Sequence, residues 1–161
     1  MKHSGTSALK IALLIIWAAW LTAVLTTNTF DAMKALGVIS ESWAFASGNF
    51  RFLTETTARY GTPRWINALL FLGVIAWDAL AAILFWRAVW LFHGQGTRSV
   101  VATRLAFAVS LCLWGAFLLA DEVFIAYVVE GTHLRIFTAQ LVTLLFIELT
   151  ADRDAVSHRA A

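Results

Sequence analysis

The chain has 161 residues, of which 60% are hydrophobic and 14% charged, and its formal net charge is +2. This balance is far more apolar than that of soluble domains, so it excludes an ordinary water-soluble protein and indicates an integral membrane protein. The few positive charges are scattered and do not form the basic surface that nucleic-acid binding requires. We therefore expect the lipid bilayer as the surroundings and no nucleic-acid partner.

Four apolar stretches have the length of a bilayer crossing, which is about 20 residues for an α-helix. They run from about 9 to 27, 65 to 92, 101 to 129 and 133 to 150. The first is too long for the apolar run of a signal peptide and offers no clear cleavage site, so it predicts a retained helix. The sequence predicts an all-α fold in which residues 1–161 form a single domain, an antiparallel bundle of four transmembrane helices.

Glycine and proline mark the ends of the later spans. Gly61-Thr62-Pro63 predicts that the second helix begins near Arg64, because proline is tolerated in a first helical turn. A glycine stop at 93–96 and a tighter turn at Gly131-Thr132 predict short connections to the third and fourth helices. Spans two, three and four are therefore expected to be antiparallel neighbours.

The connection between the first and second spans, residues 28–63, is too long for a plain linker in so small a protein. Its mixture of aromatic and polar residues favours a structured extramembrane cap with short helices at the membrane interface. Five side chains are candidates for contact with a partner or for closing a lid: Trp43, Phe45, Phe50, Arg51 and Phe52. Two interpretations stay open, a lid packed on its own helices and a docking surface or ligand gate.

Lys and Arg in short segments beside a span stay on the cytoplasmic side of a membrane. With the N-terminus inside, seven basic residues fall on that side and five on the other, and most of the five lie in the long connection, which counts less. The seven are Lys2, Lys10, Arg87, Arg98, Arg104, Arg153 and Arg159; the five are Lys34, Arg51, Arg59, Arg64 and Arg135. The distribution favours cytoplasmic N- and C-termini.

Acidic residues lie inside the predicted spans, although an ionised carboxylate near the bilayer centre costs about 2.5–3.5 kcal/mol. Four are candidate buried functional or structural acids: Asp78 in the second span, Asp121 and Glu122 in the third, and Glu148 in the fourth. Asp78 is the deepest, about halfway along its helix, whereas Glu148 is nearer the cytoplasmic end and can reach the interface.

Glu122 shares one helix face with small residues, which allow another helix to approach closely. These are Ala108, Cys112, Gly115 and Ala126. The pattern predicts that Glu122 points into the bundle and that Asp121, one position along, points about 100° away. Two adjacent acids can also share a proton, because like charges so close raise at least one of the two pKa values.

Two interpretations of these acids remain open. In the first they are structural, being protonated, hydrogen-bonded within the bundle, or paired with a basic residue of a partner subunit. In the second, Asp78 and Glu122 carry protons or cations across the membrane.

We predict no metal, because Gly131 and Thr132 should break the helix between Glu130 and His133. The four histidines fall at helix ends or in connections, which disfavours haem held by two histidines inside the membrane. No serine elbow, Cys/His pair or phosphate loop is present, so we predict no enzyme. We expect bound lipid and no cofactor, and a quinone or pigment between the helices stays open.

Several short motifs resemble the DUF2165 family of predicted small bacterial integral membrane proteins. They are Thr27-Asn28 leading to Asp31, Asn49-Phe50-Arg51-Phe52, Asp78-Ala79-Leu80 and Glu122-Val123-Phe124, within a four-span plan that covers nearly the whole chain. This chain has Asp78 and Val123 where the family usually has Glu and Trp. The resemblance implies the architecture and a bacterial inner membrane, and it implies no particular activity.

Two functions from different classes follow as hypotheses. The first is a non-catalytic accessory or anchoring subunit of a larger membrane complex, with other membrane subunits as partners. The alternative is a small proton- or ion-coupled transport protein that uses Asp78 and Glu122, in which case a homo-oligomer is expected because one four-helix bundle is small for a conduit.

Overall fold

The computed structural model describes residues 3–92 and 97–159, with side-chain surroundings for 5–92 and 98–150. Its elements are α1 (His3–Ala35), α2 (Asn49–Thr57), the 3-10 helix η1 (Ala58–Tyr60), α3 (Arg64–Phe92), α4 (Thr97–Phe124) and α5 (Tyr127–Arg159). Four of these helices, α1, α3, α4 and α5, are long and apolar enough to cross a membrane. The predicted all-α fold with four spanning helices is confirmed.

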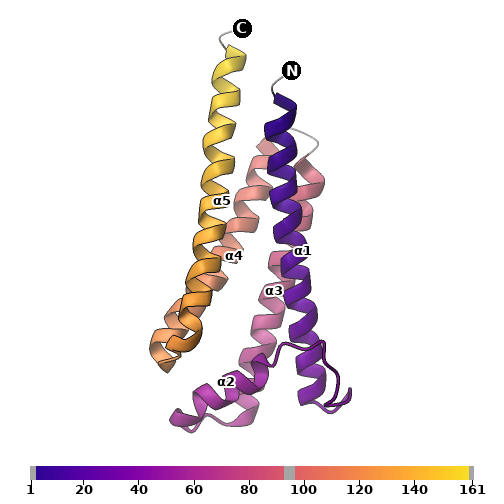
Figure 1. The fold of residues 1–161 in the computed structure, drawn as a ribbon, viewed down its shortest axis with the longest axis vertical. Helices are drawn as coiled ribbons and strands as arrows, with labels where there is room; N and C mark the ends of the chain where they lie inside the picture. Colours follow the sequence, from indigo (N-terminus) through magenta and orange to yellow (C-terminus); the bar gives the residue numbers. More distant parts are fainter. Residues whose placement is uncertain (1–2, 93–96, 160–161) are drawn as a thin grey trace.

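The long helices pack in chain order, α1 on α3, α3 on α4 and α4 on α5, whereas α1 and α5 touch much less. Figure 1 shows both chain ends at one end of the molecule and the cap, formed by the α1–α2 connection, α2 and η1, at the other. We refer to α1, α3 and the cap as one unit and to the α4–α5 hairpin as the other, although α3 packs on α4 as extensively as α4 packs on α5.

The core is built from alanine, leucine and aromatic side chains. Ala81, Phe85 and Ala88 on α3 are fully buried, and the Phe85 ring meets Phe107 of α4 edge to face, with 4.9 Å between ring centroids. A second tie between these helices is the hydrogen bond from the indole N–H of Trp77 to the Val109 carbonyl, 3.0 Å long. The α3–α4 contact thus joins the two units in the middle of the molecule.

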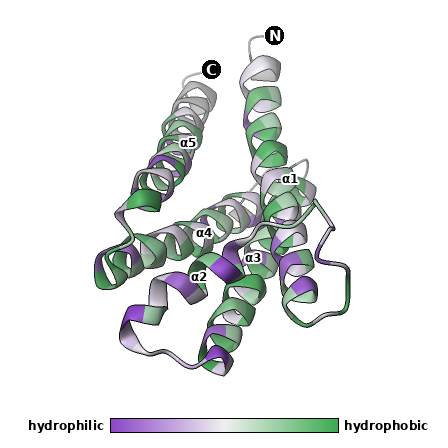
Figure 2. Ribbon diagram, turned by 60° about the horizontal axis from the view of Figure 1, so that its bottom comes forward, coloured by the Kyte–Doolittle hydropathy of each residue, from purple (hydrophilic) through white to green (hydrophobic). Residues whose placement is uncertain are grey.

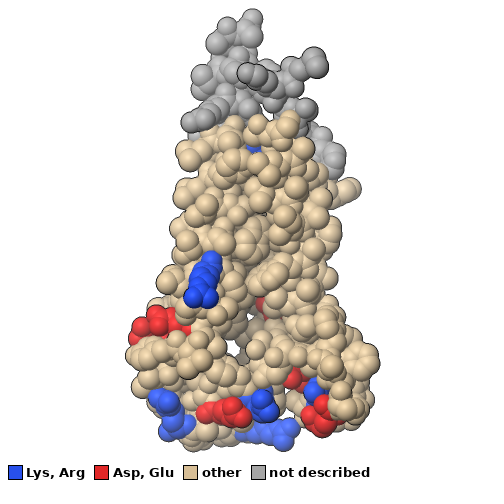
Figure 3. All heavy atoms as spheres, in the orientation of Figure 1, with Lys and Arg blue, Asp and Glu red and all other residues tan. Residues whose placement is uncertain are grey.

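The outer surface separates an apolar body from a charged end. Figure 2 shows apolar residues along all the long helices and the most hydrophilic residues gathered on the cap. In Figure 3 most of the charged side chains on the visible face lie around the cap, with a narrow hollow just above them. This division is the one expected of a bundle that stands in lipid with its cap in the aqueous interface.

Two predicted helix boundaries are wrong. α1 continues to Ala35 and does not end at 27, so Asn28 and Asp31 lie on the first spanning helix and not in the cap. The turn between the third and fourth helices lies at Ile125 and Ala126, and Gly131-Thr132 is inside α5. A glycine within a helix costs only about 1 kcal/mol, which the surrounding apolar helix outweighs.

The α4–α5 turn has the hydrogen bonds of a Schellman motif. The Ala126 N–H donates to the Asp121 carbonyl at 2.8 Å, and the Ile125 N–H donates to the Glu122 carbonyl at 3.3 Å. Ile125 occupies the left-handed position, with φ 56°, that this motif normally gives to glycine. A β-branched residue is strained in this conformation, so the sequence contains no signal for the turn.

One contact joins the cap to the end of α4. The Tyr60 hydroxyl of η1 donates to the Val123 carbonyl at 2.7 Å, and the Tyr60 ring packs against Phe124 with 5.6 Å between centroids. Val123 is in the last turn of α4, where carbonyl groups have no partner within the helix. Tyr60 therefore completes the end of α4 from the other unit.

Candidate functional site

Asp78, the deepest of the predicted acids, is the start of a hydrogen-bonded chain through three elements. The side-chain amide of Asn28 on α1 donates to Asp78 Oδ2 at 2.8 Å, and Asn28 Oδ1 accepts from the amide of Asn49 on α2 at 2.9 Å. Asp78 is 1% exposed and Asn28 2%. Because a buried polar group without a partner is costly, this chain ties α3, α1 and the cap together.

Asp31, one turn beyond Asn28 on α1, organises the start of α2. The residue before α2 is Gly48, which has φ 76° and no side chain to cap the helix. Asp31 supplies the missing N-cap interaction of α2: its Oδ2 accepts hydrogen bonds from the Phe50 N–H at 2.7 Å and from the Ser47 hydroxyl at 3.2 Å. A carboxylate is favourable at a helix N-terminus, so α1 fixes the position of the cap.

The five cap residues divide between the two interpretations. Phe50 packs inward on Phe71 of α3, with 5.6 Å between ring centroids, so it is a lid contact. Trp43 and Phe45 are half exposed, and both rings contact Phe30 of α1 at 5.5 and 6.1 Å. The other two members, Arg51 and Phe52, are also exposed, and Arg51 makes an ion pair with Glu55 at 3.7 Å.

Asp121 forms a polar contact within the α4–α5 hairpin. Its Oδ2 lies 2.6 Å from Nδ1 of His133 on α5, and Asp121 is 4% exposed. The His133 ring stacks on Phe117 with 4.9 Å between centroids, and Trp114 lies 5.8 Å away. The aromatic side chains shield the pair from lipid, which strengthens its electrostatic attraction.

The prediction that Glu122 points into the bundle is wrong, because its side chain is exposed and no described residue pairs with it. The buried face of α4 is the one that carries Asp121, and it contains Thr103, Ala106, Phe107, Ser110, Leu113 and Trp114. On the predicted face, Ala108 and Cys112 are exposed. A stripe of small residues fits a lipid-facing surface as well as a helix contact, and here the larger side chains fill the core.

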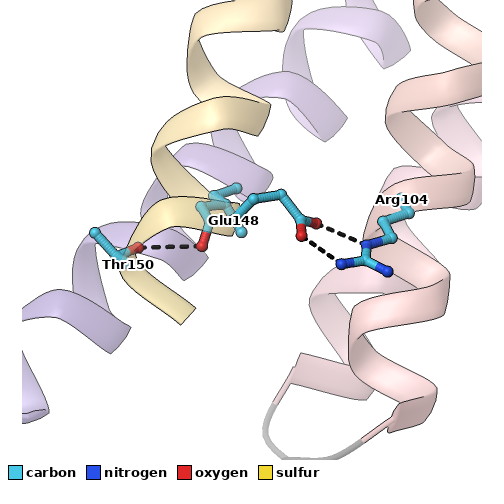
Figure 4. Close-up of polar contacts among 4 residues, drawn as sticks. Arg104, Glu148 and Thr150 are labelled. Atoms are coloured by element: carbon cyan, nitrogen blue, oxygen red, sulfur yellow. Dashed lines mark hydrogen bonds and ion pairs between the residues drawn. The ribbon is translucent and has the colours of Figure 1, made fainter. Parts of the chain in front are cut away.

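Glu148 is paired with Arg104 across the α4–α5 contact, as Figure 4 shows. Arg104 Nε donates to Glu148 Oε1 at 2.9 Å, and Nη2 donates to Oε2. The two side chains are 60% and 30% exposed, so this bidentate pair lies at the edge of the helix contact. Glu148 is therefore half-buried, and its carboxylate is paired with an arginine of the same chain.

Some buried polar atoms have no hydrogen-bond partner among the described residues. They are Asp78 Oδ1, Asn67 Nδ2, Ser110 Oγ, Trp114 Nε1, and both amide atoms of Gln140. Sequence reasoning singled out only Asp78 among these as a site. Unpaired buried groups are rare in proteins, and they mark places where water or a ligand is commonly bound.

The described part of the chain contains no group of three or more His, Cys, Asp or Glu residues that could hold a metal ion. The argument against a metal at Glu130 and His133 is nevertheless wrong in its reason, because α5 runs unbroken through both residues. The acid beside His133 is Asp121 of the neighbouring helix. His3, His93 and His158 lie outside the residues whose side chains the structure describes.

Three of the four motifs that carry the family resemblance meet in space. Asn28 and Asp31 of the first motif contact Asp78 and the start of Asn49–Phe52 through the bonds described above. Asn28 and Asp31 were not predicted as site residues. Their spacing of three places both on one helix face, a signal that is visible only once the first helix is known to extend past them.

These contacts define the class of the protein: a small multi-pass helical membrane protein, three of whose four candidate acids are held by partners on neighbouring helices of the same chain. No family model, curated protein or solved structure matches the chain.

Proposed function

We propose that this protein is a non-catalytic accessory or anchoring subunit of a larger membrane complex. The observation that supports this most directly is the outward face of the cap, formed by Trp43 and Phe45. These side chains are 47% and 53% exposed, although both contact Phe30 of α1. Exposed apolar side chains that are held in place are typical of docking surfaces.

The backbone behind this face is fixed as well. The Lys34 ammonium donates to the Trp43 carbonyl at 3.2 Å, and the indole N–H of Trp43 donates to the Phe45 carbonyl at 3.2 Å. A surface that is ordered before binding loses less conformational entropy when a partner docks. This supports a preformed contact with another protein chain.

The arrangement of the acids supports the same function. Asp78, Asp121 and Glu148 each contact a partner on a neighbouring helix, so they stabilise the bundle. Glu122 instead faces outward near the end of α4, beside Leu119 and Val123, which are 72% and 62% exposed. A basic residue of a neighbouring subunit would match this carboxylate.

The proposal is tested by purifying the protein in mild detergent and identifying the chains that accompany it in fixed stoichiometry. We expect the Trp43→Ala/Phe45→Ala variant to lose a partner chain that the wild type retains. Trp65→Ala is the matched control, because Trp65 is 64% exposed near the same end of the bundle but outside the cap. A partner that stays on the double variant, or a wild type that purifies alone, contradicts the proposal.

A second candidate function is proton- or ion-coupled transport, which one observation favours. Asp78 Oδ1 is buried without a partner about halfway along α3, and both amide atoms of Gln140 on α5 are buried without partners. Water bound at Asp78 Oδ1 would give protons access to this carboxyl group. This candidate requires assembly of several copies, because four helices enclose little space.

Reconstituted vesicles separate the two candidates. Asp78→Asn removes the titratable proton and keeps a side chain of nearly the same shape, while Glu122→Gln is the control for a carboxylate on the outer surface. Loss of proton flux in Asp78→Asn with unchanged assembly supports transport and contradicts the accessory role. Absence of flux in the wild type removes the transport candidate.

We also propose a bacterial inner membrane location with cytoplasmic termini, and membership of the DUF2165 family. The placement of both chain ends at one end of the molecule is compatible with the charge distribution that favours this orientation. The meeting of three motifs around Asn28 supports the family assignment, since it gives the matched residues one shared structural role. Neither an enzymatic activity nor a cofactor other than lipid is part of the proposal.

A further inference from the structure

A cavity of about 400 Å³ lies between α3 and α4 at the end of the molecule that carries both chain ends. Three of its lining residues come from α3 and four from α4: Arg87, Trp90, Leu91, Arg98, Val101, Ala102 and Leu105. The cavity is at the opposite end of the bundle from the cap, and its lining residue Leu105 follows Arg104, the partner of Glu148.

The polar side of the cavity is formed by two arginines. Both side chains are exposed, and neither Arg87 nor Arg98 makes a hydrogen bond or ion pair with any residue that the structure describes. Two guanidinium groups beside one cavity form a site of doubled positive charge. Their planar donor groups fit phosphate oxygens, which they can bind in pairs of parallel hydrogen bonds.

The other side of the cavity is apolar and open to the surroundings of the bundle. Trp90, Val101 and Leu105 are 78%, 57% and 42% exposed, and Ala102 forms a buried floor. Arg98 is in the first turn of α4, and Arg87 is about one turn from the end of α3. Trp90 is two residues from the end of α3, and tryptophan is enriched where spanning helices reach the lipid headgroups.

We propose that this cavity binds one anionic phospholipid, with the phosphate between Arg87 and Arg98 and an acyl chain along Val101 and Leu105. The two cations account for a preference for a lipid with net negative charge. The exposed apolar wall accounts for a preference for a lipid over free phosphate, because an acyl chain covers surface that phosphate leaves bare. The inference is independent of the proposed accessory role.

Native mass spectrometry of the full chain in mild detergent tests this site. Phosphatidylglycerol and phosphatidylethanolamine of the same acyl chains are added at equal concentration, and retained lipid is counted per protein. We expect at least fivefold more phosphatidylglycerol than phosphatidylethanolamine on the wild type. The Arg87→Gln/Arg98→Gln variant is expected to lose this preference.

The matched control is Arg59→Gln/Arg135→Gln, which removes two exposed arginines from the other end of the bundle and should keep the preference. Arg87→Lys/Arg98→Lys keeps the positive charge, so a reduced but clear preference is expected. Equal retention of the two lipids by the wild type, or equal loss of preference in the control or the lysine variant, overturns the proposal. Displacement of the lipid by millimolar inorganic phosphate also overturns it, because the site would then take the free anion.

Discussion

The two units of this bundle use buried acids in different ways. In the unit of α1, α3 and the cap, Asp78 belongs to a chain of amides that reaches α2, so one carboxylate connects three elements. In the α4–α5 hairpin, Asp121 has a histidine partner on a single neighbouring helix and aromatic rings around it. The first arrangement fixes the cap over the bundle, whereas the second joins two helices that a short turn already holds together.

The two units therefore differ in which buried contacts can be replaced. A buried pair of side chains can often be exchanged for apolar residues of similar size, because both partners disappear together. A chain of three partners cannot be exchanged at one point without leaving another group unpaired. The unit with the cap should therefore be much more sensitive to single substitutions than the hairpin.

The largest expected effect is that of Asn28→Ala, which removes the partner of Asp78 and that of Asn49 together. We expect the free energy of unfolding to fall by about 3 kcal/mol, because the buried Asp78 carboxyl group loses its hydrogen-bond partner and the cap loses one of its ties to α1. Thermal unfolding in detergent, followed by circular dichroism, measures it. The control is Thr29→Ala, whose exposed hydroxyl bonds only to the Leu25 carbonyl of its own helix. Equal melting of the two variants would show that the network does not support the fold.

His133→Phe tests the hairpin, because it keeps the stack on Phe117 and removes the partner of Asp121. A loss of about 2 kcal/mol is expected from the unpaired buried carboxylate. Adding Asp121→Leu to His133→Phe should recover most of this loss, since the carboxylate that the single variant leaves unpaired is then gone. The same unfolding measurement applies, and a double variant less stable than the single one contradicts the contrast drawn between the units.

Asp31→Ala removes the carboxylate that caps α2. The expected loss in free energy of unfolding is about 1 kcal/mol, as for other helices that lose an N-terminal capping side chain. The destabilisation should be confined to the extramembrane cap. Hydrogen exchange of the Phe50 amide should accelerate severalfold while amides in the middle of α3 stay unchanged. Glu55→Ala, an exposed acid on α2 itself, is the control. Faster exchange throughout both units would mean that Asp31 supports the whole bundle.

Ile125→Gly is expected to stabilise the hairpin. Glycine relieves the strain of φ 56° at the left-handed position of the α4–α5 turn, so a gain of about 1 kcal/mol is expected. Ile83→Gly is the control, because Ile83 is exposed in the middle of α3, where glycine should destabilise by about the same amount. A lower melting temperature for Ile125→Gly would show that the contacts of the Ile125 side chain stabilise the hairpin by more than its backbone strain destabilises it.

The smallest effect is expected for Glu148→Gln. Arg104 is 60% exposed, so solvent weakens the pair and the loss should be less than about 1 kcal/mol. The difference from the wild type should shrink further in 1 M salt, which screens exposed charges. A loss as large as that of His133→Phe would place this pair among the main supports of the hairpin.

The spans were predictable from the sequence because bilayer crossing requires a long apolar helix whatever its neighbours are. The start of α3 was also predictable, since Pro63 cannot lie inside a helix. The turn at Ile125 was not, because an isoleucine in the left-handed conformation runs against every local preference. There the turn is set by the hydrogen bonds that close α4.

The position of the candidate acids along their helices was predictable from the sequence, but the helix face on which each one points was not. Asp78 follows from its position halfway along an apolar stretch, but its partner Asn28 is fifty residues away and no local pattern joins them. The choice between Asp121 and Glu122 failed because both faces of α4 are apolar, so hydrophobic periodicity cannot distinguish lipid from protein. Packing of large rings such as Trp114 decided it.

The bond from Tyr60 to the Val123 carbonyl has a mechanical consequence. α1 and α5 touch little, and the two units are joined by the α3–α4 contact, by this tyrosine, by the hydrogen bond from the Trp17 indole N–H to the Thr143 hydroxyl, and by the packing of Trp20 on Trp114. Tyr60 is the contact of this group that ties the cap itself to the hairpin. Tyr60→Phe would therefore free the Val123 carbonyl at the capped end, while the tryptophan contacts would still join α1 to the hairpin.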